Sequence, residues 1–207
     1  VVGDISSAAF LIVGALISKS ERLKIYGVGM NPSRIGVLNV LKDMGAQINI
    51  ENQRVESNEP VADLVVLPSL LKGITIDGSI IPNVIDEIPI ISIAAAFADG
   101  DTVIRDAAEL RVKESDRLSA VSAGFLALGI KHNNFDDGMT IHGNAKLLEL
   151  SEPVTIDSHH DHRIAMSFLI AGLNCNQPIT VLDCDNILTS FPAFIELTAS
   201  LGYNLEK

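Results

Sequence analysis

The sequence predicts an α/β fold made of three βαβαββ repeat units with pseudo-threefold symmetry, with buried helices inside and sheets outside. Three segments share one pattern, in which an aspartate leads into an Ala-rich apolar stretch of helical length: DISSAAFLIVGALI from Asp4, DEIPIISIAAAFADG from Asp86 and DHRIAMSFLIAGL from Asp161. A short β-rich run follows each segment, and a second amphipathic stretch then ends in a glycine: Gly45, Gly129 and Gly202. Because the spacing from aspartate to glycine is nearly equal in all three, the pattern indicates an internal repeat.

The first helix of each unit is expected to lie in the middle of the domain, because its residues are apolar on almost every side. An aspartate before such a run is typical of a helix N-cap, whose carboxylate accepts hydrogen bonds from backbone N–H groups of the first turn. On this interpretation Asp4, Asp86 and Asp161 each begin a buried helix, and for Asp86 this could be its whole role.

The second helix of each unit is expected to end at its glycine, which favours the left-handed conformation of a helix stop. Strands are predicted where β-branched residues gather, before the first helices in GITIDGSII and PVTID and after them in LKIYGV, DTVIRDA and PITVLD. INIENQRVE and KHNNFDDGMTIHG have the polar turns of hairpins, and the second contains an Asp-Gly turn signal.

The pattern divides residues 1–207 as one domain with repeat units at about 1–58, 59–146 and 147–207. The first unit has almost no leading strand, since only Val1 and Val2 are available as a strand tail, and the third stops without its hairpin. The chain also opens without a methionine. We therefore expect a piece of a longer protein, whose other segments complete the first and third units.

Composition argues against several classes of function. Hydrophobic residues make up 47% and charged residues 20%, which is the profile of a globular chain rather than a disordered one. The net charge of −11 argues against general binding to nucleic acid or to an anionic membrane surface. The most apolar run, Ala8 to Ile17, has about half the length that spans a bilayer. Two cysteines, Cys175 and Cys184, are too few for a secreted disulfide scaffold, so a reduced cytoplasmic setting is expected.

Candidate site residues gather at the start of the second unit's second helix, in ELRVKESDRLSAV. Threefold symmetry would bring the helix N-terminal ends together, and helix dipoles favour anions there. Lys113 and Arg117 stand at i and i+4, on one face of the predicted helix, with Glu114 three residues before Arg117. Two cations beside a carboxylate suit a phosphate or carboxylate ligand with an acid or base next to it. A solvated, salt-bridged helix start is the alternative interpretation.

The hexapeptide SHHDHR, Ser158 to Arg163, groups three histidines beside an aspartate. A metal site there would need further ligands from distant segments, and the sequence has no HExxH or CxxC motif. His162 and Arg163 fall in the first turn of the third unit's first helix, where an arginine opposes the helix dipole. An anion bound at that end would offset this cost, so Arg163 is a candidate anion ligand. His159 and His160 are interpreted as the linker between a strand and that helix.

Several motifs together resemble one enzyme family. GDISSAAFLI, DEIPIISIAAAFADG, LRVKESDRLSAV, DHRIAMSFLIAGL and TSFPAF are similar to the C-terminal domain of the 5-enolpyruvylshikimate-3-phosphate synthases, over essentially the whole chain. The resemblance implies the enolpyruvyl transferase fold, in which two domains of three units each close on substrates bound between them. It implies transfer of the carboxyvinyl group of phosphoenolpyruvate to the 5-hydroxyl of shikimate 3-phosphate, with release of phosphate, in the shikimate pathway. The family uses no metal and no organic cofactor.

The resemblance also implies catalytic roles for two carboxylates. Asp86 matches the proton acceptor near the 5-hydroxyl of the shikimate ligand. Glu114 matches the group that handles the proton at the methylene carbon of phosphoenolpyruvate, and protonating that carbon makes its neighbour electrophilic. Lys113 matches a residue that contacts the shikimate ligand.

The donor-binding matches lie in the second and third units. Arg117 and Arg163 match the guanidinium groups that hold the anionic donor, since planar bidentate pairing suits carboxylate and phosphate. His162 matches the histidine beside the second of these arginines. Thr189 departs from the family pattern, because many members carry a lysine at this position before TFP or SFP.

The resemblance leaves half of the site outside the chain. In the family, the N-terminal domain supplies a catalytic lysine, a Ser-Ser-Gln group for the shikimate phosphate and a further donor-binding arginine. The expected partners are therefore phosphoenolpyruvate, shikimate 3-phosphate and that N-terminal domain, with no nucleic acid and no membrane. We expect the full-length enzyme to be a cytoplasmic monomer, and the isolated chain to fold without turning over substrate.

Three other functions compete with this interpretation. A carboxyvinyltransferase that acts on UDP-N-acetylglucosamine shares the fold, but RVKESDR followed by DHRIAM favours the shikimate enzyme. A metal-dependent hydrolase would use the HHDH cluster, and stoichiometric zinc or manganese in the purified protein would favour it. The third is a non-catalytic binding module.

Overall fold

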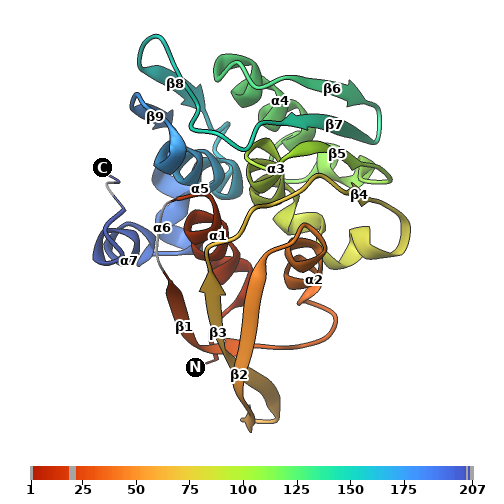
Figure 1. Ribbon diagram of the computed structural model, residues 1–207, viewed down its shortest axis with the longest axis vertical. Coiled ribbons are helices and arrows are strands. Elements are labelled where there is room, and N and C mark those ends of the chain that lie inside the picture. Colours follow the sequence, from red (N-terminus) through yellow and green to blue (C-terminus); the bar gives the residue numbers. More distant parts are fainter. Residues whose placement is uncertain (1, 19–21, 204, 206–207) are drawn as a thin grey trace.

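Three apolar helices lie side by side in the middle of the structure, and three sheets surround them (Figure 1). The computed structural model describes residues 2–18, 22–203 and 205. The first unit consists of α1 (Ile5–Ile17), β1 (Leu23–Gly29), α2 (Gly36–Asp43), β2 (Gln47–Glu56) and β3 (Glu59–Leu67).

The second unit repeats this order after a leading strand, with short 3-10 turns added, and the third has the leading strand but no hairpin strands among its described residues. The second consists of β4 (Thr75–Ile76), η1 (Gly78–Asn83), η2 (Ile85–Glu87), α3 (Ile88–Ala96), β5 (Gly100–Ile104), η3 (Ala108–Val112), α4 (Arg117–Ala127), β6 (His132–Phe135) and β7 (Gly138–Gly143). The third consists of β8 (Val154–Asp157), α5 (His162–Ala171), η4 (Gly172–Asn174), β9 (Ile179–Leu182), η5 (Cys184–Asn186), α6 (Ile187–Ser190) and α7 (Phe194–Ser200).

The sheet of the second unit has the complete arrangement of strands, and the sheets of the first and third units each have part of it. In the second unit β4 pairs parallel with β5, and β5 pairs antiparallel with β7 of the β6–β7 hairpin. In the first unit β1 pairs antiparallel with β3 of its hairpin, and Gly3 bridges Val28 in parallel at the place of the leading strand. In the third unit β8 and β9 pair in parallel, and the described residues add no hairpin to them. The predicted α/β architecture of helices inside and sheets outside is confirmed.

The core is formed where the first helices of the three units meet. α1, α3 and α5 contact one another, and buried apolar side chains from all three units belong to one cluster. α4 packs closely on α5, since a Cβ atom at Gly124 would lie 2.0 Å from the ring of Phe168. The prediction that the first helices are buried is confirmed.

Several boundaries differ from the prediction. The division expected near residue 58 falls inside a hairpin, because β3 pairs with both β1 and β2 and so belongs to the first unit. A strand was expected in GITIDGSII, but only Thr75 and Ile76 form one. A 3-10 turn begins at Gly78, whose φ is positive, and ends the extended segment. Val1 lies outside the described residues, and Val2 is not part of a strand.

The helix stops and hairpin turns were predicted with mixed success. Gly45, Gly129 and Gly202 all have positive φ just after a helix, as predicted. The second hairpin forms, but its turn residues are Asp136 and Asp137, and Gly138 already belongs to β7. A Cβ atom at Gly138 would lie 2.0 Å from the Ile104 carbonyl oxygen, so close strand packing explains this glycine.

The described part of the third unit has a largely apolar cavity on its surface. A cavity of about 1000 Å³ lies in the third unit beside β9 and α7, where Ile179, Val181 and Tyr203 contribute to its wall. None of the helices in the described part of the chain is long and apolar enough to cross a membrane.

Asp63 holds together two β-bulges in the first sheet. Its buried carboxylate accepts hydrogen bonds from Asn52 Nδ2 at 2.9 Å, from the Gly27 N–H at 3.0 Å and from Arg54 Nη1 at 3.2 Å. These hydrogen bonds, led by that of Asn52, lower the pKa of Asp63 from 3.8 to about 2. The ionised form therefore stabilises the folded chain.

Replacing Asp63 by asparagine is expected to lower the urea midpoint of unfolding at neutral pH. Because the folded-state pKa is depressed, the stabilisation is complete above about pH 4 and is lost as the pH falls toward about 2. The difference between wild type and Asp63→Asn should shrink across that window, as followed by circular dichroism. Asp43→Asn, at the exposed end of α2, is the control, and a difference that does not change with pH would contradict the assignment.

Candidate active site

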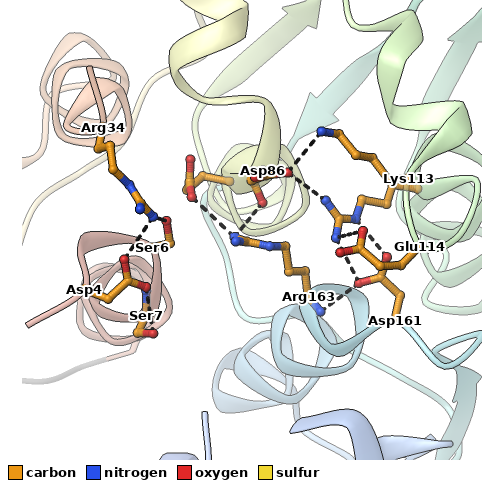
Figure 2. Close-up of polar contacts among 11 residues, drawn as sticks. Asp4, Ser6, Ser7, Arg34, Asp86, Lys113, Glu114, Asp161 and Arg163 are labelled. Atoms are coloured by element: carbon orange, nitrogen blue, oxygen red, sulfur yellow. Dashed lines mark hydrogen bonds and ion pairs between the residues drawn. The ribbon is translucent and has the colours of Figure 1, made fainter. Parts of the chain in front are cut away.

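The N-terminal ends of α1, α3 and α5 lie on one side of the core, but only two of them carry the predicted aspartate cap (Figure 2). Asp4 accepts a hydrogen bond from the Ser7 N–H at 2.9 Å, and Asp161 accepts one from the Arg163 N–H at 2.8 Å. The cap prediction for Asp86 is wrong, because Asp86 lies in the 3-10 turn η2 and the residue before α3 is Glu87. The carboxylate of Asp86 is therefore available for other contacts.

A buried guanidinium joins three carboxylates at this end of the molecule. The side chain of Arg117 is 1% exposed, and each of its three nitrogens contacts a different carboxylate. Nε donates to Asp161 at 2.8 Å, Nη1 to Asp86 at 3.1 Å and Nη2 to Glu114 at 2.5 Å. Asp86 and Glu114, the two predicted catalytic carboxylates, thus lie on the same guanidinium.

Asp161 connects two helices through this guanidinium. Its Oδ1 caps α5, while its Oδ2 binds Arg117 at the start of α4 and accepts from the Ser115 hydroxyl at 3.1 Å. The side chain of Asp161 is fully buried, and although burial opposes ionisation, the bonds from Arg117 and the α5 backbone lower its pKa. Asp161 is therefore a buried anion that is matched to a buried cation.

Asp86 faces three cations while part of its surface stays open. Its side chain is 44% exposed, and Lys113 Nζ lies 3.5 Å from the Oδ1 that Arg117 also binds. Burial alone would raise the pKa of Asp86, but the charges of Arg163, Lys113 and Arg117 outweigh it and lower the pKa. Asp86 is thus a carboxylate at neutral pH with room for a ligand beside it.

Lys113 and Glu114 lie at the site, but they are on a different structural element from the predicted one. Neither lies on α4, which begins at Arg117 after the N-cap Asp116, whose carboxylate accepts from the Ser119 N–H. The prediction that Lys113 and Arg117 share a helix face is therefore wrong. Lys113 has extended backbone just after η3, and this turn still directs its ammonium group to Asp86.

Arg163 reaches from α5 across to the α3 end of the site (Figure 2). Its Nη1 donates to the Asp86 carbonyl oxygen at 3.0 Å and to Glu87 Oε1 at 3.3 Å. The neighbouring His162 is half-buried, and burial together with the charge of Arg163 lowers its pKa, so it is neutral at pH 7. Arg163 and His162 therefore lie beside Asp86 and Glu114, as predicted from their positions in the sequence.

An open hollow of about 540 Å³ adjoins the network on the α5 and α6 side. It is lined by Glu114, His160, His162, Asn186, Thr189 and Ser190. Thr189 Oγ1 donates to the Asn186 carbonyl oxygen at 2.9 Å, so this wall carries a hydroxyl at the position where the resemblance implied a lysine. The hollow has one carboxylate and no lysine or arginine among its lining residues.

His159, His160 and the two cysteines make no hydrogen bond or ion pair with the carboxylates around Arg117 in the described part of the chain, although His160 lines the hollow beside them. His159 and His160 have positive φ and lie in the exposed turn before α5, near Asp157 and Asp183 respectively. Nowhere in the described ranges do three or more His, Cys, Asp or Glu side chains come together as a metal-binding group. Burial raises the pKa of both cysteines, that of Cys175 to about 11, so neither is activated as a nucleophile.

Known proteins are similar to this chain over most of its length. The sequence model of the family described as EPSP synthase (3-phosphoshikimate 1-carboxyvinyltransferase) matches residues 1–197. This chain belongs to the EPSP synthase family. Among curated members, a 3-phosphoshikimate 1-carboxyvinyltransferase of Geobacter sulfurreducens is 52% identical over 197 residues, covering 95% of this chain and 45% of that protein. One of Hydrogenovibrio crunogenus is 47% identical over 205 residues, covering 99% of this chain and 45% of that protein.

Solved structures resemble the fold closely. An EPSP synthase from Acinetobacter baumannii superposes with a TM-score of 0.93 at 44% identity, covering all of this chain and 47% of that one. The enolpyruvyl transferase NikO from Streptomyces tendae shares the fold, with a TM-score of 0.77 at 20% identity over 99% of this chain and 44% of that one. The chain thus spans about half the length of the EPSP synthase family members that it matches.

Sequence reasoning missed two parts of the network in this EPSP synthase family member. Asp161 was predicted only as a cap, and its bond to Arg117 joins residues 44 apart in the chain. Glu87 was given no role, and its partner Arg163 lies 76 residues away. The repeat contained a signal for this pair. When Asp86 is aligned with Asp161, Glu87 and Arg163 both fall at the start of the first helix of their units, and the predicted symmetry brings those helix ends together.

Replacing Asp161 by asparagine is expected to destabilise the chain far more than replacing Asp4 by asparagine. Asparagine still caps a helix, so capping is nearly preserved in both variants. Only Asp161→Asn removes the fully buried counter-charge of the Arg117 guanidinium and leaves it with the partly exposed carboxylates of Asp86 and Glu114. This loss should cost about 3 kcal/mol more in the free energy of unfolding. The Asp4 pair with Arg34 is exposed, which makes it the matched control. Equal losses in urea unfolding would show that Asp161 acts only as a cap.

Proposed function

We propose that this chain is the C-terminal half of an enzyme that transfers the carboxyvinyl group of phosphoenolpyruvate to the 5-hydroxyl of shikimate 3-phosphate. The observation that carries the proposal is the convergence of Asp86 and Glu114 on Arg117, with Lys113 and Arg163 beside Asp86. Close relatives named 3-phosphoshikimate 1-carboxyvinyltransferase support it.

The reaction needs two proton-handling groups, and the site offers two carboxylates in different surroundings. Addition of a proton to the methylene carbon of the donor lets the 5-hydroxyl oxygen bond to the adjacent carbon. Loss of a proton from the new methyl group and of phosphate then restores the double bond. Glu114, at 52% exposure, is assigned to the carbon and Asp86 to the hydroxyl. Because the pKa of Asp86 is low, its proton transfer should accompany C–O bond formation rather than precede it.

The charges of the network support the expectation that this half is inactive alone. Three cations, Lys113, Arg117 and Arg163, face five carboxylates. Both proposed substrates are anions with phosphate groups, so these eight charged side chains by themselves would repel them on balance. The N-terminal half of the enzyme must then add cations, and we infer that it closes over this face. We also infer that the complete enzyme is a cytoplasmic monomer.

The full-length protein that carries this chain is expected to release phosphate from phosphoenolpyruvate only when shikimate 3-phosphate is present. UDP-N-acetylglucosamine in place of shikimate 3-phosphate serves as the control acceptor, and the isolated 207 residues serve as the control protein. Phosphate release with the nucleotide sugar alone would contradict the proposed acceptor. Turnover by the isolated chain would contradict the need for a second half.

Asp86→Asn in the full-length enzyme is expected to lower kcat about a hundredfold, because the amide cannot accept the hydroxyl proton. Asn retains the size of the side chain, so the KM for shikimate 3-phosphate should change much less. Asp101→Asn, on the outer sheet beside His142, is the matched control and should leave kcat unchanged. A wild-type kcat in Asp86→Asn would remove Asp86 from proton transfer.

A further inference from the structure

Glu87 is a buried carboxylate to which the proposed mechanism gives no task. Its side chain is 6% exposed, and a carboxylate is rarely buried unless a cation pairs with it. It occupies the N-cap position of α3, yet its side chain makes no capping hydrogen bond. Among the residues that the structure describes, its ionic partner is Arg163, with Nη1 at 3.3 Å from Oε1.

The side-chain hydrogen bonds of Arg163 to the described residues use only Nη1 of its guanidinium, and the side chain is 15% exposed. Nη1 is held twice, by Glu87 and by the Asp86 carbonyl oxygen at 3.0 Å. Across the described ranges, neither Nε nor Nη2 of Arg163 donates a hydrogen bond to the protein. Nε and Nη2 form the edge that pairs with both oxygens of a carboxylate or phosphate. Arg117 differs, because all three of its nitrogens are already bound to carboxylates.

The turn η2 contributes to both predicted functions of the site, which are proton transfer and anion binding. It presents the Asp86 carboxylate toward Lys113 and Arg117, and the next residue, Glu87, toward Arg163. The same turn therefore sets where the proton acceptor lies and how the anion-binding arginine is oriented. A long arginine side chain loses rotamer freedom when it is held, so an arginine fixed in advance binds an anion more tightly.

We infer that Glu87 is a positioning residue, which fixes the guanidinium of Arg163 so that its Nε and Nη2 edge faces the anionic donor. The inference rests on the proposed function for the identity of that donor. It assigns to Glu87 no contact with either substrate, and its effect should pass entirely through Arg163.

The test is a set of variants in the full-length enzyme. Glu87→Met keeps the length of the side chain and tolerates burial but has no acceptor oxygen, so the KM for phosphoenolpyruvate should rise about tenfold. The KM for shikimate 3-phosphate should stay within about twofold. Glu87→Gln retains an acceptor for Nη1, so it should recover most of the donor affinity. Glu51→Gln, which removes the charge paired with Lys24 on the outer first sheet, is the control.

A double-mutant cycle separates positioning from general damage. Arg163→Ala should itself raise the donor KM, and adding Glu87→Met to it should change that KM by less than about twofold. An additional large loss in the double variant, or equal rises in both KM values for Glu87→Met, would overturn the inference. Should Glu87→Met fail to fold, Glu87→Gln carries the same cycle, with a smaller effect that must also vanish beside Arg163→Ala.

A crystal structure of the full-length Glu87→Met or Glu87→Gln variant distinguishes this inference from the proposed function. Arg163 Nη1 should leave the Asp86 carbonyl oxygen in Glu87→Met and stay near it in Glu87→Gln, whatever the substrate is. An unmoved Arg163 in Glu87→Met would overturn the inference even in an active enzyme. Absence of turnover in the wild type would instead overturn the proposed function and leave this structural result standing on its own.

Discussion

The site depends on one buried ion pair, between Arg117 and Asp161. Asp161 caps α5 and at the same time binds the residue that begins α4, so two helices from different units are fixed to each other at their N-terminal ends. The remaining nitrogens of Arg117 reach Asp86 and Glu114. Because a buried guanidinium is unstable without its counter-charges, the pair that stabilises the fold also determines where the proposed catalytic carboxylates lie.

The repeat explains how so many charges come together in a chain with a net charge of −11. Each unit directs a helix N-terminus toward the same side, and the second and third units have adapted theirs to different tasks. The α1 end keeps an exposed pair of Asp4 and Arg34, apart from the network. The α3 end has no side-chain cap. Its two carboxylates pair with different arginines, Asp86 with Arg117 and Glu87 with Arg163. The fold thus offers three equivalent positions, of which two form the network.

The sequence correctly predicted those features that depend on residues close together in the chain. Asp4 and Asp161 are caps because an aspartate before an apolar helix binds its own first turn, and the glycine stops follow from the same short-range rules. Asp86 was wrongly predicted to be a helix cap because it lies in a 3-10 turn before α3. Lys113 was wrongly placed on a helix because Asp116 is the N-cap of α4, which begins only at Arg117. Pairs that span the chain, such as Glu87 with Arg163, leave no periodic pattern. Family resemblance supplied the roles that periodicity alone leaves open.

The central claim is that the Arg117 and Asp161 pair is a fixed frame that holds Asp86 at the acceptor hydroxyl. A crystal structure of the full-length protein with shikimate 3-phosphate bound tests it most directly. We expect Arg117 Nε to remain within hydrogen-bonding distance of Asp161 and the Asp86 carboxylate to lie within about 3 Å of the 5-hydroxyl oxygen. A complex in which Arg117 has left Asp161, or in which Asp86 faces away from the bound hydroxyl, would contradict the account.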